Sequence, residues 1–179
     1  MPAIKKNTTL IRDAQIVTMN PNREIIHGDV LIKDDFIIAI GDIEGDTETV
    51  IDACGMTLTP GFIQTHVHLC QTLFRNAADD LSLLDWLHQK ILPLEAAHSP
   101  SSIRVSAKLG LAELLRGGTT TILDMGTVHH TDVIFEEIEL AGIRAISGKC
   151  MMDKCIGNLS SLSESPKASL DESEQLAKN

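Results

Sequence analysis

Two histidines separated by one residue, His66 and His68, are the side chains of this sequence best suited to binding a metal. They end the run TPGFIQTHVH (59–68), which is typical of a turn followed by a short buried strand. Side chains two positions apart on a strand point to the same side, so both imidazoles are expected to face one point. Imidazole is the commonest protein ligand of zinc and also suits iron. The alternative is two partly exposed loop histidines.

Five further polar or aromatic residues lie at the ends of predicted elements, where they could serve a substrate. Gln71 lies in the polar loop after the histidine strand, and Glu95 follows the next predicted helix, where a carboxylate could bind ligand hydroxyls or else be a solvated loop acid. Trp86, the only tryptophan, lies in that helix and could equally serve core or lid packing. Lys149 ends the third predicted strand and could reach a ligand. Asp124 ends the second, either orienting a histidine or simply accepting hydrogen bonds.

The four cysteines predict reduced, mostly buried thiols. No two of them form a CxxC pair, so a zinc ribbon is excluded. Cys70 continues the spacing of His66 and His68 and could be a third ligand, but the strand is expected to have ended before it. The other three are Cys54, Cys150 and Cys155.

Composition predicts a globular protein that acts on small molecules. The 179 residues are 43% hydrophobic and 22% charged, and the formal net charge is −10. That charge argues against binding nucleic acid or an anionic membrane, which both require basic surfaces. No apolar run approaches the roughly 18 residues that span a bilayer, and no apolar segment typical of a signal peptide follows the first six residues. A cytoplasmic location is therefore expected.

The chain divides into a β-rich beginning and a strand–helix remainder. Residues 1–58 predict a strand over 10–19 and a hairpin whose arms are 30–32 and 36–40. From Gly61 strands alternate with helices, which implies right-handed crossovers and a parallel sheet or barrel. The expected strands are 62–68, 119–125 and 143–152, and the expected helices are 82–92, 100–116, 131–141 and 170–178. Pro93 is expected to stop the first helix, and the run 119–125 is expected to be buried on both faces.

A series of motifs then resembles one family. The run PGFIQTHVH (60–68) is similar to the first metal motif of the amidohydrolase superfamily. Further runs are similar to the branch that holds S-adenosylhomocysteine, methylthioadenosine and 5′-deoxyadenosine deaminases, guanine deaminases and triazine chlorohydrolases. These runs are QTLFR (71–75), DLSLLDWL (80–87), LPLE (92–95), GGTTT (117–121) and RAISGK (144–149).

The resemblance implies a fold, a cofactor and a reaction. The fold is α/β: the N-terminal part of a (β/α)8 barrel over 59–179, preceded by a small, incomplete β-sandwich subdomain over 1–58. One divalent metal is implied, zinc first and iron as the alternative, with His66 and His68 matching its first two ligands. Glu95 matches the acid that contacts the ribose hydroxyls, and Gln71, Trp86 and Lys149 complete the expected substrate contacts. Hydrolytic deamination of an adenosine-like nucleoside is implied, with a homo-oligomer as an open alternative for the full-length protein.

Two departures from the family keep alternatives open. The run GKCMMD (148–153) and Gln71 are closer to guanine deaminases, so guanine or a triazine is the alternative substrate. A barrel of this type needs about 250 residues, and 61–179 supplies 119 (179 − 61 + 1) with no histidine after His130. The chain is therefore expected to be an N-terminal fragment whose other ligands and acid/base residues lie beyond Asn179. Alone it is expected to be inactive, and a non-enzymatic remnant is the second hypothesis.

Overall fold

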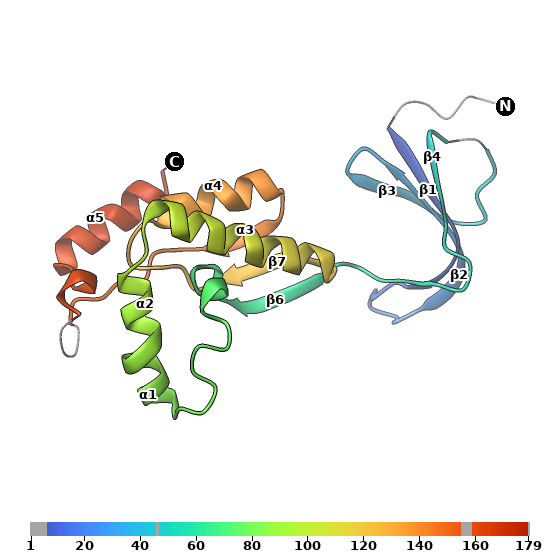
Figure 1. Ribbon diagram of the computed structural model, residues 1–179. Helices are drawn as coiled ribbons and strands as arrows, with labels where there is room; N and C mark the ends of the chain where they lie inside the picture. The colour runs from blue at the N-terminus through green and yellow to red at the C-terminus, as the bar shows by residue number, and fades with distance from the viewer. Residues whose placement is uncertain (1–6, 46, 155–158, 179) are drawn as a thin grey trace. The chain divides into compact units, whose positions relative to one another are not determined.

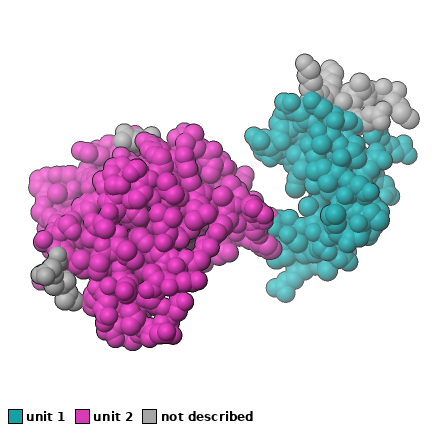
Figure 2. All heavy atoms as spheres, viewed as in Figure 1, with its two compact units in different colours: residues 1–60 teal, residues 61–179 magenta. Residues whose placement is uncertain are grey.

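The computed structural model describes residues 7–45, 47–154 and 159–178, arranged in two compact units, 1–60 and 61–179 (Figures 1 and 2). Each unit has its own sheet. Cys155 lies outside the described residues. Among the helices of the described segments, none has the length and apolarity to cross a membrane.

The first unit is a five-stranded sheet. Strand β1 lies centrally, antiparallel to β2 and parallel to β4 and β5, and β3 pairs with β2. The predicted hairpin is confirmed, because β2 and β3 flank the turn at Asp34 and Asp35. Apolar side chains at Ala14, Ile16 and Val30 form its small core. The strands are β1 (Thr8–Val17), β2 (Ile25–Lys33), β3 (Phe36–Gly41), β4 (Thr49–Asp52) and β5 (Thr57–Leu58).

The second unit is a three-stranded parallel sheet in the order β6-β7-β8, which confirms the predicted β/α alternation. Its strands are β6 (Phe62–Val67), β7 (Thr119–Asp124) and β8 (Arg144–Ser147). The intervening helices are the 3₁₀-helix η1 (Leu69–Phe74), α1 (Leu83–Trp86), the π-helical turn η2 (Leu87–Ile91), α2 (Leu92–Ala96), α3 (Pro100–Arg116) and α4 (Thr131–Ala141). The 3₁₀-helix η3 (Ser160–Leu162) and α5 (Pro166–Leu176) follow β8.

Helices α3 and α4 cover one face of this sheet (Figure 1). The predicted start of α3 is confirmed: Ser99 caps it by accepting from the Ser102 N–H, and Pro100 occupies the first turn. Fully buried Ile103 and Ile134, one from each helix, pack with Ile122 of β7. The opposite face of the sheet carries three exposed apolar residues, Ile63, Leu123 and Ile146. The expectation that 119–125 is buried on both faces is therefore not met within the described chain.

The prediction that Pro93 stops the preceding helix is wrong. The helical run continues through α2 to Ala96, because η2 widens the helix immediately before the proline. In that turn the Leu92 N–H donates to the Leu87 carbonyl, five residues back, so the missing proline N–H falls where the regular pattern is already interrupted. Glu95 consequently lies on a helix and not in a loop.

Strand β8 ends at Ser147, five residues earlier than predicted. Beyond it the Cys150 N–H donates to the Thr127 carbonyl in the loop after β7, so the chain has left the sheet. The last helix begins at Pro166, four residues earlier than predicted, because Ser165 caps it by accepting from the Ala168 N–H.

Candidate metal centre

The imidazoles of His66 and His68 converge. Their Nε2 atoms lie 3.1 Å apart, and their ring centroids are 4.9 Å apart with the planes at 64°. Two nitrogens bound at 2.0–2.1 Å to one tetrahedral zinc would lie about 3.3 Å apart. The spacing of the two Nε2 atoms therefore fits two of the four ligand positions around a tetrahedral zinc ion. Among the residues that the structure describes, no cluster of three or more His, Cys, Asp or Glu that could hold a metal is present.

The two rings lie on one side of the chain, as their two-residue spacing predicts, and a β-bulge in β6 lies beside them. Gln64 pairs with Ile122 and Val67 with Asp124. Between these two pairs β6 advances by three residues and β7 by two, which defines the bulge. His66 lies inside this bulge, whereas His68 follows the strand and precedes η1. Bulges commonly redirect side chains beside active sites.

Gln71 and Glu95 extend the site from His68. The Gln71 Nε2 atom lies 3.3 Å from His68 Nδ1 and donates to Glu95 Oε1 at 2.7 Å. Burial lowers the pKa of His68, and the neighbouring His66 lowers it further, while Glu95 and Asp124 act in the opposite direction. A lowered pKa favours the neutral imidazole, which is the form that binds a metal.

Cys70 does not join the histidine pair in a three-residue cluster that could hold a metal, as far as the described residues go. Its thiol is fully buried and lies 3.6 Å from both Glu95 Oε1 and the Gly126 carbonyl oxygen. Burial, followed by the nearby charge of Glu95, raises the pKa of this thiol far above its ordinary value. A metal ligand must be the thiolate, so the environment of Cys70 disfavours the ligand role considered for it.

Trp86 and Lys149 are placed differently from each other. Trp86 is half-buried at the end of α1, in the same helical run as Glu95. The Lys149 side chain is wholly buried, and its Nζ lies 2.7 Å from Glu164 and 3.1 Å from Glu172 of α5, besides donating to the Val128 carbonyl. The structure therefore engages the Lys149 ammonium with protein acceptors.

Sequence reasoning missed His98 altogether. Its Nε2 donates to the Cys70 carbonyl at 2.7 Å, and its ring stacks on Phe74 with centroids 5.0 Å apart. These contacts hold η1, which follows the histidine pair, against the loop before α3. No local pattern in the sequence announces this long-range contact.

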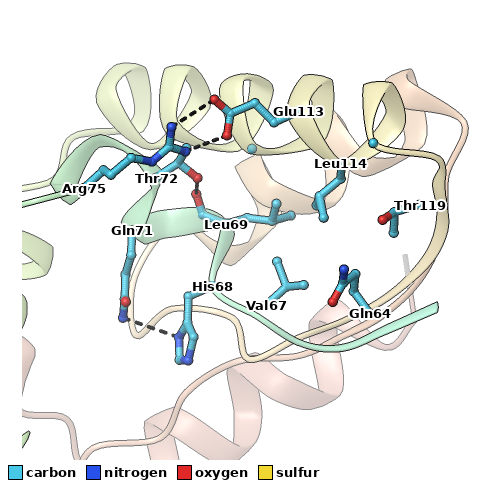
Figure 3. Close-up of a pocket in the computed structure, with 12 residues that line it drawn as sticks. Gln64, Val67, His68, Leu69, Gln71, Thr72, Arg75, Glu113, Leu114 and Thr119 are labelled. Carbon is cyan, nitrogen blue, oxygen red and sulfur yellow. Dashed lines mark hydrogen bonds and ion pairs between the residues drawn. The ribbon is translucent and has the colours of Figure 1, made fainter. Parts of the chain in front are cut away.

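An open groove of about 490 Å³ runs along the edge of β6, between η1 and α3 (Figure 3). His68 and Gln71 line one part of it, and the Arg75–Glu113 ion pair, 2.5 Å between charged atoms, lines another. His66 and Glu95 do not line it. The groove therefore follows the edge of β6 and reaches the histidine pair only at His68.

The profile of the amidohydrolase family matches residues 57–179. The chain belongs to the amidohydrolase family. It is 45% identical over 149 residues to a 5′-deoxyadenosine deaminase of Methanobrevibacter smithii, a match that covers 82% of this chain and 34% of the relative. It is 41% identical over 147 residues to a 5-methylthioadenosine/S-adenosylhomocysteine deaminase of Lawsonia intracellularis, covering 79% and 33%. The chain thus spans about a third of the length of these curated relatives.

Solved structures of the same fold confirm the fold class predicted from the sequence. Escherichia coli guanine deaminase superposes with a TM-score of 0.79 at 28% identity, covering 96% of this chain and 43% of that one. An adenosine deaminase from Xanthomonas campestris with bound zinc gives 0.76 at 27% identity, covering 95% and 39%. The open sheet β6-β7-β8 is accordingly part of an amidohydrolase barrel, and the family resemblance to metal-dependent deaminases is confirmed.

Proposed function

We propose that this chain is part of a zinc-dependent aminohydrolase that removes the amino group of an adenosine-like nucleoside. The observation that most directly supports this function is that the Nε2 atoms of His66 and His68 lie 3.1 Å apart at the carboxyl end of a parallel strand. This end of the strands is where β/α barrels have their active sites. The names of the two relatives above support 5′-deoxyadenosine, methylthioadenosine or S-adenosylhomocysteine as the substrate class.

His66 and His68 would hold the ion through their Nε2 atoms. When bound, a zinc ion supplies a water whose pKa is lowered towards 7. In the overall reaction, water adds at the ring carbon that bears the amino group, and ammonia leaves as that carbon becomes a carbonyl. Burial lowers the pKa of His68, which favours its neutral imidazole, and Gln71 contacts the ring at Nδ1.

Glu95 is proposed to bind the ribose. A carboxylate accepts two hydrogen bonds at once, which suits the adjacent hydroxyls of a nucleoside. Its Oε1 already accepts from the Gln71 amide at 2.7 Å, and this hydrogen bond helps to orient the carboxylate. Trp86, half-buried in the same helical run, is proposed to border the heterocycle. The net charge of −10 supports a small-molecule substrate over a nucleic acid.

The position of Lys149 bears on the alternative substrate, guanine. The run 148–153, which contains Lys149, and Gln71 are the parts of the sequence closer to guanine deaminases. The Lys149 ammonium, however, is engaged by Glu164 and Glu172 inside the protein, which supports a structural role for this residue. One of the two arguments for guanine is thereby weakened, and the adenosine-like substrate is preferred.

The test is ammonia release by the protein expressed from its entire gene and loaded with zinc. Release from 5′-deoxyadenosine or S-adenosylhomocysteine is expected, with little from guanine. His66→Ala and His68→Ala should reduce release to background, whereas His27→Ala, an exposed histidine of the first unit, should not. Glu95→Gln should raise KM for 5′-deoxyadenosine more than for 2′,3′-dideoxyadenosine, which lacks the hydroxyls. Release from none of the three substrates would refute the substrate proposal and favour a non-catalytic remnant.

A further inference from the structure

Asp124, at the end of β7, connects the ends of all three strands of the second unit. Its Oδ1 accepts from the Leu69 N–H at 2.9 Å, directly after His68. Its Oδ2 accepts from the Gly126 N–H at 3.0 Å and from the Ser147 hydroxyl at 2.8 Å, at the end of β8. The side chain is 3% exposed. A single buried carboxylate thus joins the segments that follow β6, β7 and β8.

The contact with Leu69 matters because His68 lies beyond the regular sheet. The last backbone hydrogen bond of this register joins the Met125 N–H to the Val67 carbonyl at 2.8 Å. Leu69 begins η1, and the first N–H groups of a helix have no partner within it. Asp124 supplies that partner, so the backbone on the far side of His68 is fixed from β7.

We propose that Asp124 is a positioning residue for the metal pair: it holds the His68 backbone so that the two Nε2 atoms stay together. This inference rests on the proposed function, since it assigns the pair to a metal. The bulge lies on the His66 side of the pair, and the Asp124–Leu69 hydrogen bond sets the His68 side. Removal of that hydrogen bond should separate the rings without removing a ligand.

The main experiment compares Asp124→Asn with Glu137→Gln in the protein expressed from its entire gene. Asparagine has the same shape but carries no negative charge, and its NH₂ group replaces one of the two oxygens, so either the Leu69 N–H or the Gly126 N–H loses its acceptor. Glu137 is the matched control: it is also 3% exposed and also paired, with Arg104, but it joins α3 to α4. Zinc affinity is measured by competition with a chromophoric chelator and stability by urea unfolding.

Asp124→Asn should weaken zinc binding at least about tenfold, as is common when support of a metal ligand is removed. Glu137→Gln should lower the urea midpoint but leave zinc affinity within about twofold. Equal affinity losses in both variants, in proportion to lost stability, would show a merely structural role and overturn the inference. Unchanged zinc affinity in Asp124→Asn would overturn it as well.

A metal-free readout separates this inference from the proposed function. In the chelator-treated protein, NMR should show a ring–ring nuclear Overhauser effect between His66 and His68 that is lost in Asp124→Asn and kept in Glu137→Gln. If the wild-type protein shows this effect but binds no zinc, the metal proposal fails and Asp124 is judged on the effect alone. If Asp124→Asn does not fold, Ser147→Ala replaces it. This variant removes the hydrogen bond from the Ser147 hydroxyl to the Asp124 carboxylate. Unchanged zinc affinity together with an unchanged nuclear Overhauser effect between the His66 and His68 rings would then refute the positioning role.

Discussion

The Lys149 ammonium lies 2.7 Å from the Glu164 carboxylate, with the lysine side chain wholly buried and that of the glutamate 10% exposed. This pair joins the loop after β8 to the segment that leads into α5, and Glu172 completes it at 3.1 Å. Lys149, which the sequence suggested as a substrate contact, is thus held by two carboxylates of the second unit.

Lys149→Met is expected to destabilise the chain by about 3 kcal/mol, because Glu164 would remain buried without its cation. Lys167→Met is the control: its ion pair with Asp171 on α5 is exposed, with side chains 83% and 55% accessible, and should cost less than about 0.5 kcal/mol. Urea unfolding at pH 7 measures both. Equal losses would show that the buried pair contributes no more than a surface pair.

Gly126→Ala is expected to cost more than about 3 kcal/mol, because the new methyl group has no room. A Cβ at this position would lie 1.6 Å from the Gly148 carbonyl oxygen, and φ is +79°. Gly142, which ends α4 with φ +68°, has nothing within 4 Å of its Cβ, so Gly142→Ala should cost only about 1 kcal/mol of backbone strain. Thermal unfolding compares the two. A mild effect at Gly126 would mean that the loops after β7 and β8 move apart easily.

Cys70 should resist alkylation and make the fold sensitive to alkaline pH. Burial raises its pKa in the folded state, so above the ordinary thiol pKa of about 8.5 the unfolded chain loses a proton that the folded chain keeps. Stability from this group is therefore present below pH 8.5 and lost as the pH rises further. Iodoacetamide at pH 8 should label exposed Cys54 before Cys70, as read by mass spectrometry. Cys70→Ala should flatten the fall of the urea midpoint between pH 8 and 10, and an unaltered fall would contradict this account.

The zinc pair itself gives a prediction for the chain without substrate. His66→Ala and His68→Ala should each weaken zinc binding by a similar factor, because the converging Nε2 atoms contribute equivalent ligands. In chelator competition, the zinc affinity of the double variant should fall to the level of nonspecific binding by surface histidines. A chain in which only one substitution mattered would not be using the pair as a joint site.

Features that depend on neighbouring residues were predictable from the sequence. The predicted helix starts near 82 and 100 and the predicted hairpin need only local hydrogen bonds. The structure has all three, with Ser82 and Ser99 as the helix caps and the turn at Asp34. The parallel sheet followed from the alternation of apolar strands and amphipathic helices, and the His66–His68 pair from its spacing.

Features that depend on distant residues were not predictable. The partners of Lys149 come from α5 and the segment before it, and no residue near Lys149 in the sequence indicates them. The Asp124 carboxylate accepts hydrogen bonds from Leu69 and Ser147, which lie on other elements. The bulge at His66 leaves the apolar pattern of β6 unchanged, so periodicity does not reveal it.

The π-helical turn Leu87–Ile91 makes the place of Glu95 depend on residue count as well as residue type. Such a turn is equivalent to one residue inserted into an α-helix. Deleting any single residue from it would restore the regular winding and rotate the following residues by about 100° around the helix axis. Glu95 would then turn away from Gln71 although every side chain of the site was still encoded. In this segment a one-codon deletion is therefore a more severe change than most substitutions.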